Sequence, residues 1–476
     1  MAVAASLFAY RAGYAVPIGD ELDILNPATQ YMHGVLRPDV KYPSFSFLFY
    51  GNWFRLAGTL DDPAGSLVVA RAVNASLLGV AVMLVYAVGR ELVRQPFALL
   101  AALGYLMMPN TLGTARIVKT ESLLVVETLV CLLALRHICR TPRSLGPHAL
   151  AAIAVGLGVT TKLSVYPALL YVAGWLFAYR QLRQPPGWRA TLVFVAGLLG
   201  TVWLTGANLR LLPQMIDFWQ SDHYFQPNAS PMRAIPSLSA FPYDRYTSFF
   251  VTTLPLALGW PIYLFSVSGV VARVQRGWYG WVVGVATLLA LLIALHATLL
   301  RVPHSFTTLY LWAAFTVALT AQHFWDSDSK TQLLGRVSVV AALACAAGYA
   351  GWDAHETESV WPDRQLASYW HDPSAKVFTS SRARGLDSET IRAQVERAKP
   401  TTLVLFNAYF MNMCRYRGHR LYLDNCRYFD ELISGRTSYR LVREIPFASP
   451  WARLQLDPAV RLARFYVLRR PEAQPR

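Results

Sequence analysis

The sequence predicts a mainly α-helical polytopic membrane protein, with about eleven transmembrane helices followed by a small α/β domain. Only 15% of the 476 residues are charged and 54% are hydrophobic, and the mean hydropathy is +0.31. Soluble domains carry roughly 25% charged residues, so this composition excludes an ordinary soluble enzyme. The 14 Trp, 24 Tyr and 23 Phe residues exclude a disordered chain, which lacks such apolar surface.

Apolar segments of nearly transmembrane length recur through the first 350 residues. A helix needs about 20 mostly apolar residues to cross a hydrocarbon layer of about 30 Å. The first segment lacks a basic flank and contains Arg11, so the alternatives to a helix there are a cleaved signal peptide or a helix cut short by a misplaced start codon. We expect spans near residues 1–16, 66–88, 97–113, 121–137, 149–161, 164–179, 190–208, 247–271, 279–300, 305–322 and 337–350.

The basic residues give these spans an orientation. If the first span leaves the cytoplasm, every short inner loop is basic, as the positive-inside rule requires. Segments 17–65 and 210–246, and everything after Gly351, then lie outside the cytoplasm. The net charge of +16 reflects this orientation, and no nucleic-acid partner is expected. The inner-loop residues are Arg90, Arg94, Arg136, Arg140, Arg143, Arg180, Arg183, Arg189, Arg273, Arg276, Lys330 and Arg336.

The composition changes abruptly near residue 350, which divides the chain into a transmembrane domain, 1–350, and an extracytoplasmic α/β domain, 351–476. In the second domain, short β-type runs at 376–380, 402–406, 439–445 and 464–468 alternate with a helical stretch at 387–398. Cys414 and Cys426 also lie there. We expect a disulfide between them if the domain faces an oxidising compartment, with two free thiols as the alternative.

The first outer loop carries a pair of acids where the first span ends. Asp20 and Glu21 follow Gly19, and the half-apolar segment 22–36 after them could lie flat on the membrane surface. A carboxylate at that depth could deprotonate an acceptor hydroxyl while the donor stays anchored in lipid. The alternative is that Asp20 merely caps the helix that follows.

Three runs of sequence, taken in order, resemble one family. They are GDELDILNPA, HG and KYPSFSFLFYGNW within 19–53, ARIVKTESLLVVETLVCLLAL at 115–135, and GLGVTTKLSVYPALL at 156–170. This order resembles the GT-C membrane glycosyltransferases, in particular the group of dolichyl-phosphate-mannose protein mannosyltransferases and bacterial lipid A aminoarabinose transferases. Lys162 matches a recurrent lysine of that group, whereas Glu121 stands in place of its usual Asp and Leu22 in place of a common Pro.

The resemblance implies an enzyme that takes a sugar from a polyprenyl-phosphate donor on the outer face and transfers it with inversion to a lipid, glycan or protein. A base must take the acceptor proton, and we expect the catalytic residues to be Asp20 and Glu21. Cations must stabilise the departing phosphate; for each basic residue, snorkelling without function is the alternative. The substrate-binding candidates are Arg116, Lys119, Glu121, Lys162, Arg301 and His304. For Glu121, the alternative is a structural ion pair with Lys119, Arg116 or Lys162.

No cofactor and no metal ligand is predicted, although the resemblance leaves a divalent metal open. The expected partners are the polyprenyl-phosphate-linked donor, an extracytoplasmic acceptor and membrane lipids, in a bacterial inner or plasma membrane. A transporter or flippase of lipid-linked sugars is the alternative function, and such proteins commonly consist of two similar halves. The polar outer loops of this chain are asymmetric, which favours the enzyme.

Overall fold

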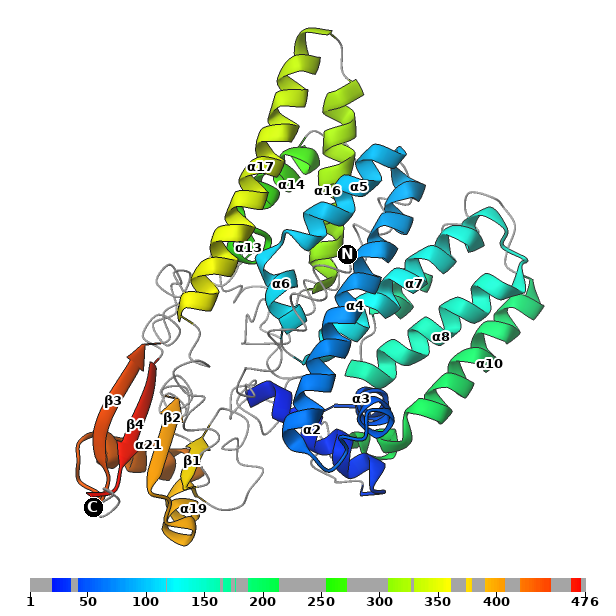
Figure 1. Ribbon diagram of the computed structural model, residues 1–476. Helices are drawn as coiled ribbons and strands as arrows, with labels where there is room; N and C mark the ends of the chain where they lie inside the picture. The colour runs from blue at the N-terminus through cyan, green and yellow to red at the C-terminus, as the bar shows by residue number, and fades with distance from the viewer. Residues whose placement is uncertain are drawn as a thin grey trace, which may run out of the picture.

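The computed structural model describes residues 19–35, 42–116, 118–162, 166–172, 176, 187–213, 254–271, 307–326, 329–360, 374–378, 390–406, 420–446 and 464–471. Helices dominate these residues, and a four-stranded sheet with two helices lies to one side (Figure 1). This arrangement confirms the predicted class, a mainly helical protein with a small sheet near its C-terminal end.

The helical part begins with two short helices and continues with longer ones. Three of the described helices, α4, α7 and α10, are long and apolar enough to cross a membrane. The bounds are α2 (Gly19–Met32), α3 (Ser44–Leu56), α4 (Pro63–Leu92), α5 (Gln95–Leu106), α6 (Pro109–Arg116), α7 (Thr120–Arg140), α8 (Leu145–Lys162), α10 (Trp188–Thr205), the 3-10 helix η1 (Ala207–Leu211), α13 (Leu254–Leu258), α14 (Trp260–Val271), α16 (Thr307–Asp326) and α17 (Ser329–Val360).

Most predicted spans coincide with described helices. Segments 66–88, 121–137 and 149–161 correspond to α4, α7 and α8, while 190–208, 305–322 and 337–350 correspond to α10 with part of η1, α16 and α17. Segments 1–16 and 279–300 lie outside the described residues, and 164–179 is described only in part. The predicted count of about eleven spans stays a prediction. The segment expected to lie on the membrane surface forms α2 over most of its length.

Two predicted spans are each interrupted by a turn. In segment 97–113, α5 ends at Leu106 and α6 begins at Pro109, because a proline disfavours the helical conformation in the residue before it. In segment 247–271, Gly259 separates α13 from α14 with a φ of +83°, a conformation that favours glycine. The prediction of one continuous helix was wrong in both segments, because apolar composition does not register a break of one or two residues.

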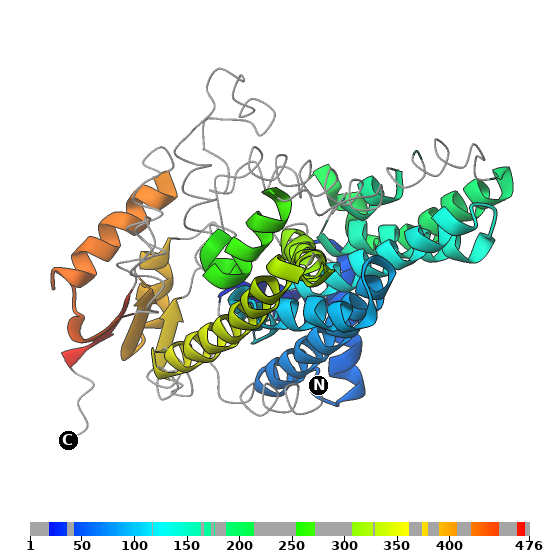
Figure 2. The ribbon, with the colours of Figure 1, turned by 90° about the horizontal axis from the view of Figure 1, so that it is seen from above.

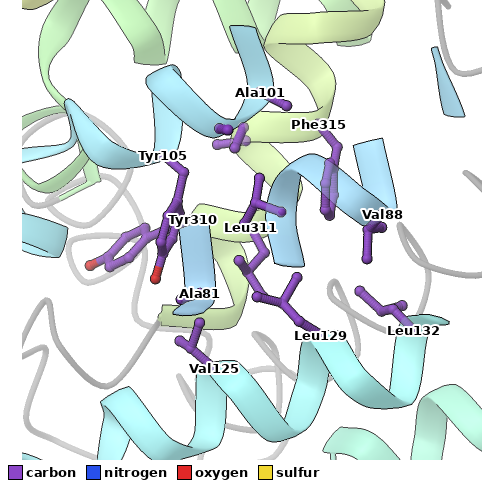
Figure 3. Close-up of a cluster of buried hydrophobic side chains, with 14 of the residues drawn as sticks. Ala81, Val88, Ala101, Tyr105, Val125, Leu129, Leu132, Tyr310, Leu311 and Phe315 are labelled. Atoms are coloured by element: carbon purple, nitrogen blue, oxygen red, sulfur yellow. The ribbon is translucent and has the colours of Figure 1, made fainter. Parts of the chain in front are cut away.

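An apolar core joins the central helices. Tyr105 of α5, Leu129 of α7, and Leu311 and Phe315 of α16 point into it alongside side chains of α4 (Figure 3). A smaller core holds α2 and α3 against α4, where Phe47 is 1% exposed. The helix α8 packs between α7 and α10. These contacts bring α2, α3 and the beginnings of α4 and α7 together.

The sheet has the strand order β1-β2-β4-β3. Strand β1 (Ala375–Phe378) is parallel to β2 (Thr402–Phe406), which pairs antiparallel with β4 (Arg464–Arg469), as β4 does with β3 (Arg440–Pro446). All four strands lie at the predicted runs to within a few residues. The helix α17 extends past the predicted domain boundary to Val360 and runs toward the sheet (Figures 1 and 2).

Two helices cover one face of the sheet. The helix α19 (Ile391–Ala398) is the predicted helix, shortened at its start, and α21 (Arg420–Ile433) was not predicted. Leu403 and Leu468 of the sheet pack against Val395 of α19 and Leu432 of α21. Cys426 of α21 is disulfide-bonded, and its predicted partner, Cys414, lies outside the described residues.

Candidate functional site

Glu21, in the first turn of α2, is fully buried and accepts three hydrogen bonds. Arg71 of α4 donates from Nε to Oε1 at 2.9 Å and from Nη2 to Oε2 at 2.6 Å. The main-chain N–H of Val118, just before α7, donates to Oε1 at 2.9 Å. The side chains of Arg71 and Glu21 are 2% and 0% exposed. This ion pair therefore ties α2 both to α4 and to the segment that leads into α7.

Asn74 extends the contact from α4 to α3 and α6. Its side-chain amide donates to the carbonyl oxygens of Thr114 and Ala115 at 2.8 and 3.2 Å. The hydroxyl of Tyr50, on α3, donates to Asn74 Oδ1 at 3.2 Å. The two bonds to the end of α6 satisfy carbonyl groups that a helix end leaves without partners inside the helix. Asn74 thus fixes the chain just before the start of α7.

A second ion pair lies at the start of α7. Lys162, the last residue of α8, donates from Nζ to Glu121 Oε1. The hydroxyl of Thr120 donates to Glu121 Oε2 at 3.2 Å. The side chain of Glu121 is 3% exposed, whereas that of Lys162 is 24% exposed. The lysine is therefore the more exposed member of the pair, so its side chain is the one that a ligand from outside can reach more readily.

The two ion pairs are close enough to act on the same side chain. Burial first, and then the negative charges of Glu121 and Glu21, raise the pKa of Tyr50 above its ordinary value. The Tyr50 hydroxyl also donates to the main-chain carbonyl of Lys119 at 3.5 Å. Tyr50 consequently remains a neutral donor between the two acids and cannot serve as a base near neutral pH.

We call Glu21, Arg71, Glu121 and Lys162 the buried ion-pair cluster. It lies where α2 and α7 begin, near the start of α4 and at the end of α8. A small hollow beside Glu121 has polar lining side chains from Tyr105, Thr111, Thr114 and Ser122.

The structure brings four of the predicted site residues to this place: Glu21, Lys119, Glu121 and Lys162. Two others have a described backbone, in α2 and α6, but side chains outside the description: Asp20 and Arg116. The remaining two lie outside the described residues: Arg301 and His304. Within the described part of the chain, no three His, Cys, Asp or Glu side chains group closely enough to hold a metal ion.

The geometry distinguishes the two acids that open α2. Both carboxylate oxygens of Glu21 accept hydrogen bonds inside the protein, and the side chain is not exposed. Glu21 can reach an acceptor only by giving up Arg71 and the N–H of Val118. This favours a supporting role for Glu21 beside Asp20, although the sequence suggested that both acids are catalytic.

Two polar residues of this region were missed in the sequence, Arg71 and Asn74. Both lie within the predicted span 66–88, one helical turn apart. A charged side chain inside a transmembrane segment usually pairs with another group and often marks a functional site. The charge of Arg71 within an apolar segment could therefore have identified it as a candidate site residue. Nothing in the sequence identified Glu21 as its partner.

One protein family matches part of the chain. Residues 63–204 match the family described as dolichyl-phosphate-mannose-protein mannosyltransferase. The matched range runs from the start of α4 almost to the end of α10, so it contains Arg71, Glu121 and Lys162 but not the first acids of α2. No curated protein matches the chain in sequence.

Solved structures match nearly the whole chain in fold. ArnT from Cupriavidus metallidurans bound to undecaprenyl phosphate has a TM-score of 0.53 at 12% identity, covering 100% of this chain and 98% of that one. Its apo state has a TM-score of 0.54 with the same identity and coverage. The archaeal oligosaccharyltransferase AglB from Archaeoglobus fulgidus, in complex with an inhibitory peptide and a dolichol-phosphate, has a TM-score of 0.51 at 11% identity, covering 95% and 80%.

These two comparisons agree with each other. ArnT and AglB are both GT-C glycosyltransferases, and the family match points to the mannosyltransferase group that the motifs resemble. The identities are low, so the structural likeness concerns the fold. The chain therefore has a GT-C-type fold and, over residues 63–204, resembles the dolichyl-phosphate-mannose-protein mannosyltransferases.

Proposed function

We propose that this chain is an integral membrane glycosyltransferase, which moves a sugar from a polyprenyl-phosphate donor to an acceptor outside the cytoplasm. The observation that carries the proposal is the pair of Glu121 and Lys162 on a GT-C-type fold, because its exposed member is a cation. ArnT and AglB were solved with undecaprenyl phosphate and a dolichol-phosphate. An ammonium group at a membrane-facing site suits the phosphate of such a lipid.

The proposed reaction is a single displacement with inversion at the anomeric carbon. The acceptor oxygen attacks that carbon on the face opposite the phosphate, and the bond from the carbon to the phosphate oxygen breaks. The electron pair leaves with the polyprenyl phosphate, and the acceptor proton passes to a base. We assign the base to Asp20, in the first turn of α2, with Glu21 holding that turn through Arg71.

Lys162 is the proposed main contact for the phosphate. An ammonium group has three N–H donors, and Glu121 Oε1 accepts one of them. The others can donate to phosphate oxygens while Glu121 keeps the ammonium in place. We propose that four further residues complete the phosphate site: Arg116, Lys119, Arg301 and His304. The reaction in this form uses no metal ion, so transfer should persist in excess EDTA.

The proposed orientation puts the sheet outside the cytoplasm, with the membrane lipids around α4, α7 and α10. This follows from the arginine distribution. A C-terminal alkaline phosphatase fusion should be active and a C-terminal green fluorescent protein fusion dark. The opposite pair of results would overturn the orientation.

The test of the function uses cells with the gene, without it, and with Asp20→Asn. Mass spectrometry of their envelope glycans and lipids should show a sugar-modified product only with the wild-type gene. Asp20→Asn preserves shape but removes the charge, so at equal protein levels the product should fall by about 10²–10⁴-fold. Glu21→Gln should have a smaller effect on turnover per folded molecule.

The other outcomes are equally informative. A near-normal amount of product in both variants would mean that Asp20 only caps the helix α2. Loss in Glu21→Gln alone, with normal expression, would make Glu21 the base. Identical products with and without the gene would refute the transferase.

A further inference from the structure

The end of α8 carries three consecutive polar residues, and each contacts a different neighbour. The Thr160 hydroxyl shares a hydrogen bond of 2.8 Å with that of Thr205, on α10. The Thr161 hydroxyl donates to Glu127 Oε1, on α7, at 2.6 Å. Lys162 bonds to Glu121, also on α7. The helix end that presents the ammonium is thus held by side chains on two sides.

Glu127 is the unexplained member of this set. It lies in the middle of α7, is 5% exposed, and its Oε2 has no hydrogen-bond partner among the described residues. An acid inside a transmembrane segment is costly, by about 2.5 kcal/mol or more on insertion scales. Gly158 of α8 packs beside this carboxyl group, since a Cβ there would lie in ordinary van der Waals contact with Oε2, at 3.7 Å. Packing alone gives no reason for a carboxyl group at this place.

Two side-chain contacts join the end of α8 to α7, Thr161 with Glu127 and Lys162 with Glu121, and their spacing suggests a role for Glu127. Glu121 and Glu127 are six residues apart, which is about 9 Å along the axis of α7. Thr161 and Lys162 are adjacent, so their side chains leave α8 about 100° apart. A single ion pair from a lysine constrains the end of a helix only loosely, because the lysine side chain is long and flexible. A second, short contact from the neighbouring residue fixes both the rotation and the height of the last turn of α8.

We propose that Glu127, acting through Thr161, is a positioning residue that holds Lys162 in reach of the polyprenyl phosphate. This inference rests on the proposed function, in which Lys162 contacts that phosphate. On its other side, the end of α8 contacts Thr205 at the end of α10, whose carbonyl accepts a hydrogen bond of 2.6 Å from Ser44 of α3.

The experiment measures the binding of undecaprenyl phosphate to the purified full-length protein, so neither the sugar nor the acceptor needs to be known. Thr161→Val and Glu127→Leu each remove the contact and should weaken binding about tenfold, the effect of one lost hydrogen bond. Thr161→Ser and Glu127→Gln keep a donor and an acceptor, so binding should stay within about twofold of wild type. Thr320→Val is the matched control, because this buried hydroxyl bonds only to the carbonyl of Thr316 in its own helix among the described residues, at 2.7 Å.

A double variant separates positioning from a general loss of structure. In the Lys162→Ala background, Thr161→Val should weaken binding no further, because the residue that it positions is gone. Additive effects, or unchanged binding in Thr161→Val, would overturn the inference. No binding by the wild type, or unchanged binding in Lys162→Ala, would instead refute the proposed function of Lys162. A lower melting temperature with normal binding in both Thr161→Val and Glu127→Leu would make the contact purely structural.

Discussion

The helices α4 and α7 carry ion pairs at both ends, and the two ends differ in burial. Where the helices begin, the four charged side chains of the buried ion-pair cluster are between 0% and 24% exposed. Where they end, Glu91 of α4 meets Arg136 and Arg140 of α7, and these three side chains are 24%, 25% and 52% exposed. Nearby, Arg94 pairs with Asp326, and these side chains are 58% and 45% exposed.

The charged residues therefore have different roles at the two ends of α4 and α7. Exposed pairs contribute little to stability, about 0–1 kcal/mol, and suit the arginine bias that orients a membrane protein. A buried pair is costly to desolvate and adds little net stability over an apolar pair, but losing one partner leaves an uncompensated charge. The buried pairs accordingly fix the positions of the side chains where the helices begin. The more exposed pairs where the helices end supply charge and add little stability.

The largest effect is expected from Arg71→Met, which leaves the Glu21 carboxylate buried without its cation. The free energy of unfolding should fall by about 3–5 kcal/mol, seen as a large drop in melting temperature or in the yield of monodisperse protein in detergent. Adding Glu21→Leu to this variant should restore much of the loss, because both charges are then gone. A double variant as unstable as the single one would show that burial of charge is not the cause.

A smaller effect is expected from Asn74→Leu. The substitution removes the donor to the carbonyl oxygens of Thr114 and Ala115 and the acceptor for Tyr50. Buried polar groups that lose their partners cost about 1–3 kcal/mol, so thermal unfolding should shift less than in Arg71→Met. A shift as small as that of a surface substitution would mean that water replaces the amide.

The smallest effect is expected from Arg140→Met, at the exposed end. Arg136 keeps its contact with Glu91 at 3.2 Å, and an exposed pair contributes about 0–1 kcal/mol. The melting temperature should therefore change little, and any difference from wild type should shrink further at high salt. A loss as large as that of Arg71→Met would remove the distinction between the two ends.

The local features of the fold were predictable from the sequence. The strand from Thr402 to Phe406 was predicted with its observed bounds. The helix α7 was predicted from its long apolar stretch. The helix α21 was missed although its sequence carries a helical pattern: apolar residues alternate with polar ones, and Tyr428 and Leu432, four residues apart, both pack into the core beneath the sheet.

The site was predictable only as a set of residue types. Lys162 and Glu121 were both selected, and an ion pair of Glu121 with Arg116, Lys119 or Lys162 was one of the predictions, but no local pattern picks out Lys162, which lies 41 residues away. Arg71 was read as part of an apolar span, and the tie to Glu21 crosses 50 residues. Tertiary packing determines which side chains face each other. The sequence therefore identified candidate residues but could not determine which of them pair.

The long sequence separation of these contacts has a consequence for biosynthesis. Glu21 receives its bond from Val118 across 97 residues, and the carbonyl of Tyr42 receives one from Asn208 across 166 residues. Ribosomes add about 5–20 residues per second, so Tyr42 waits about 8–30 s for Asn208 to be made. During that interval the acids at the start of α2 are already synthesised but lack the scaffold that holds them. The site therefore cannot assemble before Asn208 has been made, so its geometry is completed well after the loop that carries the acids has been synthesised.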